Sequence, residues 1–264
     1  MITLIKDALS LLLYIITLPF SRRKCAVLVY HSVERIDASY DPNKISVDPE
    51  LFEKQMADLS KYRDRFVVSF DDGYENVYLN AFPILKKYGI RSILFLTTGH
   101  IDGKVSFDRF FSGRKAPKAL TWGQVKEMSA AGIELGSHSA THRVMSGLDE
   151  GEAYNEALSS GKRIAEATGC NPLSFSYPFG NAGSFNGTTE DALKRAGYKR
   201  AYSNIMGMAN GGGDNFEIRR IRIYPTDTIF RFRMKVAGAY NWVDLLAGFG
   251  GGGTVSRPGK NVGY

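Results

Sequence analysis

Short apolar runs alternate with longer amphipathic stretches along most of this 264-residue chain. Nearly uninterrupted apolar runs are typical of strands that are buried on both faces of a parallel sheet. They predict strands at residues 26–30, 66–70, 90–96, 133–135, 174–177 and 218–223. Apolar positions at helical spacing predict helices at residues 49–62, 78–88, 122–131, 152–168 and 189–196. Repeated strand and helix units of this kind predict an α/β fold with a parallel sheet, either open or closed into a barrel.

The polar residues that can do chemistry come directly after these predicted strands. In parallel α/β folds the carboxyl ends of the strands face the active site, so side chains that follow different strands meet at one rim. The sequence therefore predicts a functional site at that rim, built from His31, Asp71, Asp72, His138 and the pair Pro178-Phe179.

Two of the four histidines, His138 and His142, stand four residues apart. On a helical turn this spacing puts both imidazoles on one face, and with one carboxylate of Asp71 or Asp72 they make the three-ligand arrangement of a catalytic metal. Each pattern has a structural alternative, because an Asp-Asp-Gly turn is common after strands and paired histidines also occur in cores and on surfaces. Their combination in a chain with so few histidines favours a metal-dependent hydrolase.

Composition permits one catalytic domain, which we place at residues 25–247. A chain of this length with 44% hydrophobic residues can bury a substantial core. Its two cysteines, Cys25 and Cys170, lie far apart without CxxC spacing, so neither a thiolate zinc site nor a disulfide framework is indicated. The net charge of +7 suits a partner that carries phosphate, but charge alone does not choose among nucleic acid, an anionic membrane and a phosphorylated substrate.

The first 24 residues predict a membrane-associating segment. Residues 8–20 are strongly apolar and are followed by Arg22, Arg23 and Lys24. A span needs about 20 apolar residues, and a signal peptide carries its positive charge before the apolar region, so a monotopic or re-entrant anchor fits better than either. The positive-inside bias places the domain on the cytoplasmic side. The alternative is an N-terminal helix packed on the domain, and at the other end the glycine-rich residues 248–264 are expected to be disordered.

Two longer motifs resemble those of a known family, the polysaccharide deacetylases of the NodB-homology type (carbohydrate esterase family 4). Residues 69–73 (SFDDG) resemble the first motif of the family, and residues 136–142 (GSHSATH) resemble the second. The resemblance covers residues 25–224 and implies a distorted (β/α) barrel with fewer than eight complete units.

The same resemblance implies roles for the residues of the two motifs. Asp71 corresponds to the general base, and Asp72, His138 and His142 correspond to the metal ligands. The backbone N–H of Phe179 corresponds to the oxyanion donor. The implied cofactor is one divalent metal ion, with zinc as the first choice and cobalt, nickel, manganese or iron as alternatives.

Two later motifs depart from the common family pattern. Residues 175–180 (FSYPFG) lack the arginine that orients the catalytic aspartate, and residues 219–223 (RRIRI) lack the Leu-x-His whose histidine is the general acid. Residues 29–32 (VYHS) and the Tyr-Pro-aromatic-Gly segment resemble the branch with the poly-N-acetylglucosamine deacetylases, which makes His31 the candidate acid. Further candidates for substrate binding are Tyr177, Pro178, Arg219 and Arg220. The alternative for the two arginines is that they supply charge near the site. His100 is expected to be a structural residue or to lie at the edge of the site.

The expected function is hydrolysis of the N-acyl group, in the first place N-acetyl, of an amino sugar. The apolar amino terminus and the basic charge balance favour a glycan carried on a polyprenyl phosphate at a membrane, and no nucleic acid is expected as a partner. One alternative is an extracytoplasmic deacetylase of exopolysaccharide or peptidoglycan. Another, of a different class, is a non-catalytic carbohydrate-binding protein that has kept the metal scaffold.

Overall fold

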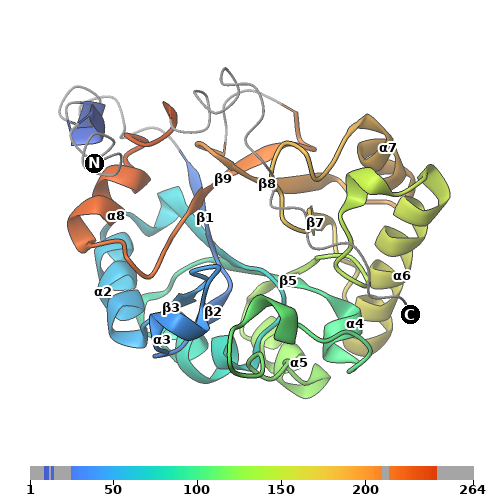
Figure 1. The fold of residues 1–264 in the computed structure, drawn as a ribbon, viewed down its shortest axis with the longest axis horizontal. Helices are drawn as coiled ribbons and strands as arrows, with labels where there is room; N and C mark the ends of the chain where they lie inside the picture. Colours follow the sequence, from blue (N-terminus) through green and yellow to red (C-terminus); the bar gives the residue numbers. More distant parts are fainter. Residues whose placement is uncertain (1–8, 12, 15–24, 210–213, 243–264) are drawn as a thin grey trace.

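Seven parallel strands close into a barrel at the centre of the molecule (Figure 1). The computed structural model describes residues 9–11, 13–14, 25–209 and 214–242. The strands follow one another around the barrel as β1 (Ala26–Tyr30), β4 (Phe66–Phe70), β5 (Ser92–Leu96), β6 (Glu134–Ser137), β7 (Ser174–Ser176), β8 (Arg200–Met206) and β9 (Ile218–Arg222). This architecture confirms the expected distorted barrel with fewer than eight complete units.

Strand β1 closes the barrel because it pairs with β4 on one side and with β9 on the other. Its pairing with β4 runs in register along the whole strand, from Ala26 opposite Phe66 to Tyr30 opposite Phe70. The far side of the barrel is less regular. Strands β6 and β7 pair only at Ser137 and Phe175, and the register of β8 against β9 shifts between Tyr202 and Met206.

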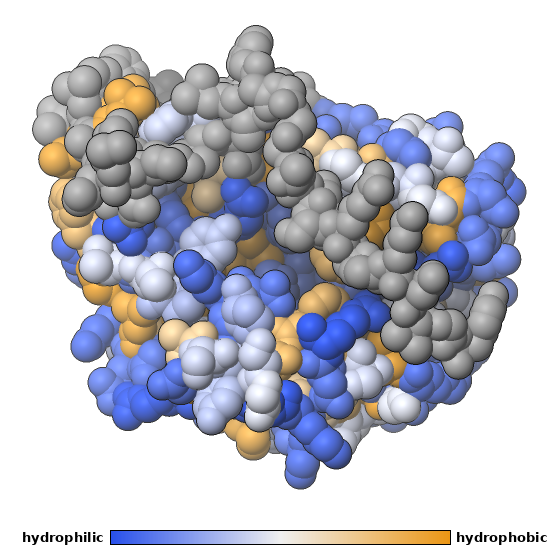
Figure 2. Space-filling view, viewed as in Figure 1, coloured by the Kyte–Doolittle hydropathy of each residue, from blue (hydrophilic) through white to orange (hydrophobic). Residues whose placement is uncertain are grey.

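An outer layer of helices covers most of the barrel, although none is drawn outside β8 and β9 at the top of the view (Figure 1). It contains α2 (Pro49–Leu59), α3 (Phe82–Tyr88), α4 (Thr98–Ile101), α5 (Trp122–Ala130), α6 (Glu150–Thr168), α7 (Gly187–Arg195) and α8 (Ile229–Val236). Shorter elements are a π-helical turn (Val77–Ala81), 3-10 turns (Ala38–Tyr40, Ser60–Arg65, Asp108–Phe110, Met145–Gly147) and a two-stranded sheet of β2 (Ser32–Val33) and β3 (Ser46–Val47). Hydrophilic side chains dominate the face drawn in Figure 2, as expected for helices whose apolar sides pack inward.

Local sequence signals set the ends of these helices. Thr121 forms a capping box with Gln124 at the start of α5, and Asp149 forms one with Glu152 at the start of α6. Each box satisfies backbone N–H groups that the first turn of a helix leaves without partners. Helix α3 ends at Gly89, which adopts a left-handed φ of 62° that suits glycine.

Apolar side chains from the strands and from α2 share the main core. Leu28, Val68 and Leu94 of the barrel belong to the same buried cluster as Phe52 and Met56 of α2, and all five are fully buried. Burying one side chain of this size stabilises the fold by about 1.5–3 kcal/mol relative to leaving it exposed. A second cluster lies among β7, α6 and α7. These clusters fix the strands, and therefore fix where each strand ends.

Most of the expected strands and helices are present, with small shifts of their ends. The short strands β2 and β3 and the helices α4 and α8 were not among the expected elements. Strand β8 was not expected, because its sequence RAYSNIM mixes polar and apolar positions. The expected helix at residues 78–88 is a π-helical turn followed by α3.

Part of the expected amino-terminal segment lies within the described residues. Leu13 and Tyr14 pack against Met234, Ala239 and Tyr240 beside α8. Among the described residues, no helix has the length and apolar character that crossing a membrane requires. The rest of the segment, and the expected disordered tail at residues 248–264, lie outside the described residues.

Candidate active site

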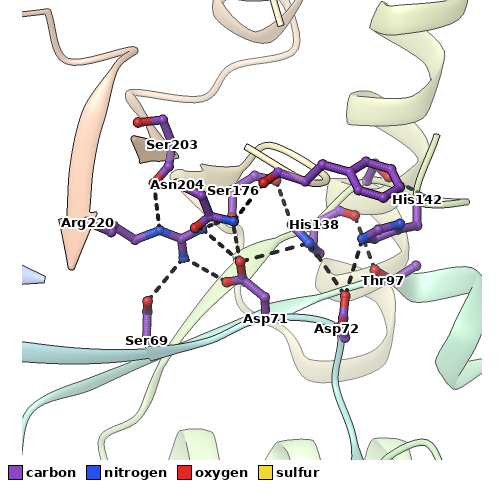
Figure 3. Close-up of polar contacts among 12 residues, drawn as sticks. Ser69, Asp71, Asp72, Thr97, His138, His142, Ser176, Ser203, Asn204 and Arg220 are labelled. Carbon is purple, nitrogen blue, oxygen red and sulfur yellow. Dashed lines mark hydrogen bonds and ion pairs between the residues drawn. The ribbon is translucent and has the colours of Figure 1, made fainter. Parts of the chain in front are cut away.

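The barrel strands bring the expected polar residues together at one rim (Figure 3). Asp71 and Asp72 follow β4, His138 follows β6, and Arg220 lies in β9. All four side chains are buried. The rim therefore holds two carboxylates, an imidazole and a guanidinium in a place that is shielded from water, where charges interact strongly.

Asp72, His138 and His142 offer three ligand atoms that lie within 4.8 Å of one another. The Oδ1 atom of Asp72 is 3.6 Å from Nε2 of His138 and 3.3 Å from Nε2 of His142. Among the described residues, buried Asp72 Oδ1 and His142 Nδ1 find no hydrogen-bond partner of good geometry. A buried carboxylate oxygen left in this way is costly unless a cation satisfies it. One carboxylate and two imidazoles therefore fit a divalent metal.

Left-handed backbone turns aim these ligands at one another. Asp72 and Gly73 have φ values of 75° and 89°, and Ser139 and His142 have φ values of 65° and 59°. This conformation is uncommon for residues other than glycine. Residues 138–142 therefore form a loop, and the helical turn that the four-residue spacing suggested is wrong. The two imidazoles meet because the loop reverses direction, not because they share a helix face.

Glu156 of α6 holds this loop in place. Its carboxylate accepts hydrogen bonds from the backbone N–H groups of Ala140 and Thr141, at 3.0 and 2.8 Å, and from the Thr141 hydroxyl at 2.6 Å. Within the loop, the Ser139 hydroxyl accepts a bond from the backbone N–H of His142 at 2.9 Å. Such bonds from outside a ligand set commonly decide how its members are oriented.

The ring orientation of His138 suits a metal ligand. Its Nδ1 lies 2.7 Å from the backbone carbonyl of Ser176, and because a carbonyl only accepts, Nδ1 carries the proton. Nε2 then carries no proton, so its lone pair is free to bind a metal ion, and it faces Asp72. Burial lowers the pKa of His138 to about 4, although Asp71 opposes the shift. The imidazole is therefore neutral at neutral pH, as a metal ligand must be.

Asp71 is held by Arg220 through two parallel hydrogen bonds. Arg220 Nη1 donates to Oδ1 at 2.8 Å and Nη2 donates to Oδ2 at 2.7 Å, with neither side chain exposed. Burial alone would raise the pKa of Asp71, but Arg220 and, more weakly, His138 and His31 outweigh it, so that this pKa lies below its usual value. Asp71 is therefore an ionised carboxylate in a fixed orientation.

Further contacts hold the Arg220 guanidinium. Its Nε donates to the carbonyl of Ser203 at 2.9 Å and its Nη1 to the hydroxyl of Ser69 at 3.1 Å. Its Nη2 also reaches the Ser176 hydroxyl and the Asn204 Oδ1 atom, both at 2.8 Å. The orienting arginine that the segment 175–180 lacks is thus supplied by β9. Arg220 has no exposed surface, so it does not fit the expected role in substrate binding.

A tight turn at residues 178–180 lies beside the histidines. Phe179 has a φ of 65° and a side chain that is 40% exposed, and its ring centre is 4.9 Å from that of His142. Its backbone N–H makes no hydrogen bond with any described residue, whereas its carbonyl accepts from Asn204 Nδ2 at 2.8 Å. The turn therefore offers an unpaired amide donor near the candidate metal ligands.

Comparisons with known proteins agree with this geometry. A family model described as polysaccharide deacetylase matches residues 60–201, more than half of the chain. The chain belongs to the polysaccharide deacetylase family. It is a hydrolase, a polysaccharide de-N-acetylase, and the resemblance drawn from the two motifs is confirmed.

Relatives of this deacetylase include proteins of the expected branch. It is 26% identical over 223 residues to the putative polysaccharide deacetylase YxkH of Bacillus subtilis, covering 76% of this chain and 72% of that protein. It is 26% identical over 207 residues to poly-β-1,6-N-acetyl-D-glucosamine N-deacetylase of Staphylococcus aureus, covering 75% of this chain and 66% of that protein. A solved structure of Streptococcus pyogenes deacetylase PplD in complex with acetate shares the fold, with a TM-score of 0.67 and 21% identity over 81% of this chain and 98% of that one.

Of the other substrate-binding candidates of the deacetylase, Tyr177 and Pro178 are buried and Arg219 is not. Tyr177 is fully buried, and its hydroxyl donates to the carbonyl of Phe216 at 2.9 Å. Pro178 is also buried. Arg219 is partly exposed and pairs with Glu217 at 3.3 Å. Tyr177 therefore anchors the start of the 178–180 turn, and Pro178 is a buried part of that turn.

The remaining two histidines have different surroundings. His31 follows β1, is partly buried, and lies close enough to both carboxylates to contribute to the lowering of the Asp71 and Asp72 pKa values. His100 packs its ring 4.2 Å from that of Phe107, and its Nδ1 is 3.1 Å from the carbonyl of Val105. His31 is thus beside the site, while His100 belongs to the loop packing next to it.

Three supporting residues were not singled out from the sequence. Ser176 lies inside the segment 175–180 that was compared with a family motif, so its position could have identified it as a residue near the site. Glu156 reads as an ordinary polar residue of an amphipathic helix, and Asn204 lies in the strand that was not expected. Neither of these two carries a local signal, because each acts on residues far away in the chain.

Proposed function

We propose that this deacetylase removes the N-acetyl group of an amino sugar, with a divalent metal held by Asp72, His138 and His142 and with Asp71 as general base. The position of Asp71 carries the proposal. Its Oδ2 atom lies 4.0 Å from His138 Nε2, while Arg220 holds both of its oxygens. A fixed, ionised carboxylate next to a three-ligand cluster is the arrangement that amide hydrolysis requires.

A metal bound there, with zinc as the first candidate, would polarise the amide carbonyl and make a water molecule more acidic. Asp71 takes the proton from the attacking water, because Arg220 keeps its carboxylate ionised and correctly turned. The backbone N–H of Phe179, which has no other partner among the described residues, donates to the oxyanion that develops on the carbonyl oxygen. Asp71 thus acts on the attacking water, and the Phe179 N–H acts on the carbonyl oxygen.

His31 supplies the proton that the departing amine needs. It follows β1 and interacts with both Asp71 and Asp72, so it borders the reaction centre. Protonation of the nitrogen breaks the amide bond and releases acetate and a free amino sugar. The missing Leu-x-His segment is then no obstacle to catalysis, because the acid comes from the other end of the chain.

The proposed substrate is a glycan of N-acetylated amino sugars, in the first place one linked to polyprenyl phosphate at a membrane surface. The Staphylococcus aureus relative is named for poly-β-1,6-N-acetyl-D-glucosamine, which supports the sugar class. The apolar residues 8–20, the following basic cluster and the net charge of +7 support a membrane-associated enzyme acting on the cytoplasmic face. A soluble exopolysaccharide or peptidoglycan substrate on the extracytoplasmic face is the alternative.

The test measures metal content and acetate release for the wild type, Asp71→Asn and the control Asp64→Asn, whose side chain is exposed. Each protein is given free N-acetylglucosamine oligosaccharides and a polyprenyl-phosphate-linked N-acetyl sugar. We expect Asp71→Asn to keep its metal and lose most acetate release, while Asp64→Asn behaves as the wild type. Normal turnover in Asp71→Asn would remove Asp71 as the base. Bound metal without acetate release in the wild type would favour the carbohydrate-binding alternative.

The two substrates also separate the two settings. Release from the lipid-linked sugar alone supports the membrane-surface enzyme, and release from the free oligosaccharide alone supports the exopolysaccharide alternative. Flotation of the full chain with anionic liposomes tests the membrane contact independently. A reporter fused to the C-terminus, active on only one side of a membrane, tests the side.

A further inference from the structure

Asn204 lies where strand β8 departs from regular pairing. The register of β8 against β9 shifts between Tyr202 and Met206, and irregularities of this kind often aim a side chain in a new direction. The Asn204 side chain is only 8% exposed, and it points to the Arg220 guanidinium (Figure 3). A buried amide at this place must be hydrogen-bonded to be tolerated.

Asn204 uses both ends of its side chain and its own backbone. Its Oδ1 atom accepts from Arg220 Nη2 at 2.8 Å. Its Nδ2 atom donates to the carbonyl of Phe179 at 2.8 Å, and its backbone N–H donates to the carbonyl of Gly180 at 2.7 Å. One residue therefore ties two successive carbonyls of the turn to the arginine behind Asp71.

The turn needs such a hold, because Phe179 and Gly180 both have left-handed φ values, 65° and 67°. This conformation costs a phenylalanine about 1–3 kcal/mol and persists only where the surroundings impose it. The approach is close: a Cβ atom added to Gly180 would lie 2.7 Å from the backbone nitrogen of Asn204. Asn204 is thus the part of the barrel against which the turn is fixed.

The same residue touches the other half of the site through Arg220. The Nη2 atom that donates to Asn204 also donates to Asp71 Oδ2 at 2.7 Å. Removing the Asn204 acceptor would leave this buried nitrogen with only Asp71 and Ser176 as partners, and would weaken one of the contacts that orient the guanidinium. One side chain therefore contributes both to the orientation of Asp71 and to the position of the Phe179 amide.

We infer that Asn204 is a positioning residue that holds the Asp71 carboxylate and the Phe179 amide in one fixed relation across the reaction centre. The inference rests on the proposed function, in which Asp71 is the base and the Phe179 N–H faces the oxyanion. Because Asn204 is buried and makes no hydrogen bond to Asp72, His138 or His142, its loss should lower kcat and leave KM and metal affinity nearly unchanged. Removing a direct oxyanion donor costs about 100- to 1000-fold, so displacing one indirectly should cost about tenfold or more.

The experiment compares Asn204→Ala and Asn204→Leu with the control Asn181→Ala. Leucine keeps a similar volume and removes both hydrogen-bonding ends, so it separates lost hydrogen bonds from an empty space. Asn181 lies in the same segment, and among the described residues its Oδ1 accepts from the backbone N–H of Gly183 alone, at 3.0 Å. We expect both Asn204 variants to lose kcat by about tenfold or more, and Asn181→Ala to retain the wild-type kcat.

A second acyl group separates positioning from a general loss of structure. A trifluoroacetyl group stabilises negative charge on its own carbonyl oxygen, so its hydrolysis depends less on the Phe179 donor and on the base. Asn204→Ala should therefore be less impaired on N-trifluoroacetyl than on N-acetyl glucosamine oligosaccharides. An equal loss on both, or a loss that Asn181→Ala shares, would show that Asn204 only stabilises the fold and would overturn the inference.

Nuclear magnetic resonance of the backbone amides tests the hold without any substrate. In the wild type, the amides of Phe179 and Gly180 should be as ordered as those of β8, and Asn204→Leu should loosen them. Mobile turn amides in the wild type contradict the inference, even if the Asn204 variants fail to fold. If the wild type releases no acetate, the proposed function is contradicted instead. If the wild type releases acetate and Asn204→Leu is fully active, the inference alone is contradicted.

Discussion

Arg220 and Asp71 meet through two parallel hydrogen bonds of 2.8 and 2.7 Å, and neither side chain is exposed. They come from β9 and from the end of β4, which lie on either side of β1 in the barrel. A guanidinium paired in this way supplies both charge and orientation, because its planar fork matches the two carboxylate oxygens. The barrel closure through β1 is therefore a condition for the fixed orientation of Asp71.

Replacing Arg220 with methionine should move the acid limb of the kcat/KM profile to higher pH. Arg220 lowers the pKa of Asp71 against the effect of burial, so without it the carboxylate takes up a proton at a higher pH and the base is lost there. Pairing with arginine lowers a carboxyl pKa by about one to three units, which sets the expected size of the shift. Arg220→Lys should retain part of the effect, since it keeps the charge and loses the fork.

Arg219→Met is the matched control, because Arg219 is the neighbouring arginine and, among the described residues, forms an ion pair with Glu217 alone. Its pH profile should match that of the wild type. If the acid limb of folded Arg220→Met stays at the wild-type pH, the limb does not report the titration of Asp71. That result would contradict the role of Asp71 as the base.

The motif residues could be predicted from the sequence because each depends on short-range order. Asp71 and Asp72 end an apolar strand, and parallel strands carry such endings to one rim. The four-residue spacing correctly predicts that His138 and His142 lie together, although they meet in a loop and not on a helical turn. The backbone at Ser139 and His142 is left-handed, and no residue type in that loop reveals this conformation in advance.

The supporting residues could not be predicted, because their partners are distant in the chain. Strand β8 lacks a continuous apolar signature, and one of its polar side chains, Asn204, binds Arg220. Arg220 itself was proposed to bind substrate or to supply charge near the site, and alternation along a strand does not tell which of three neighbouring arginines points into the barrel. Tyr177 looked like a contact residue next to the turn, yet its side chain is buried.

Removing either imidazole from the ligand cluster should remove the metal. In His138→Ala or His142→Ala, Asp72 keeps only one nitrogen partner, so tight binding of a divalent ion is lost. Metal content measured by mass spectrometry on purified protein should fall from about one ion per chain to near zero. His100→Gln should retain its metal, because His100 packs against Phe107 and contacts Val105. Stoichiometric metal in either alanine variant would refute the ligand assignment.

Glu156→Gln should weaken metal binding without touching a ligand. The glutamine can no longer accept all the hydrogen bonds that Ala140 and Thr141 donate to Glu156, so the loop that carries His142 loosens. Changes of this kind commonly cost about 10- to 100-fold in metal affinity. Competition with a fluorescent chelator measures the affinity. Glu166→Gln, an exposed change on the same helix, is the control, and equal affinities in the two variants would leave Glu156 without this role.

His31→Gln should slow the reaction and change the basic limb of the pH profile. The proposed acid must carry a proton to give to the departing amine, so wild-type activity should fall at high pH as that proton is lost. Without His31 the rate should drop by about 100-fold or more, and the basic limb should flatten. Metal content must stay normal, since His31 is not one of the three ligands. Kinetics identical to those of the wild type would make His31 a structural residue at the end of β1.

The metal-free protein should lose stability as the pH falls from about 6.5 towards 4. Burial lowers the pKa of His138 from its ordinary value of 6.5 to about 4. In that interval the unfolded chain binds a proton at His138 that the folded protein does not, so the free energy of unfolding falls as the pH falls. The loss from this one group is on the order of 3 kcal/mol.

Urea unfolding of chelator-treated protein at pH 7 and 4.5 measures this loss of stability. His138→Gln should show a smaller loss, although not zero, because burial also lowers the pKa of His100. An equal loss in wild type and variant would mean that the buried His138 is not the group responsible.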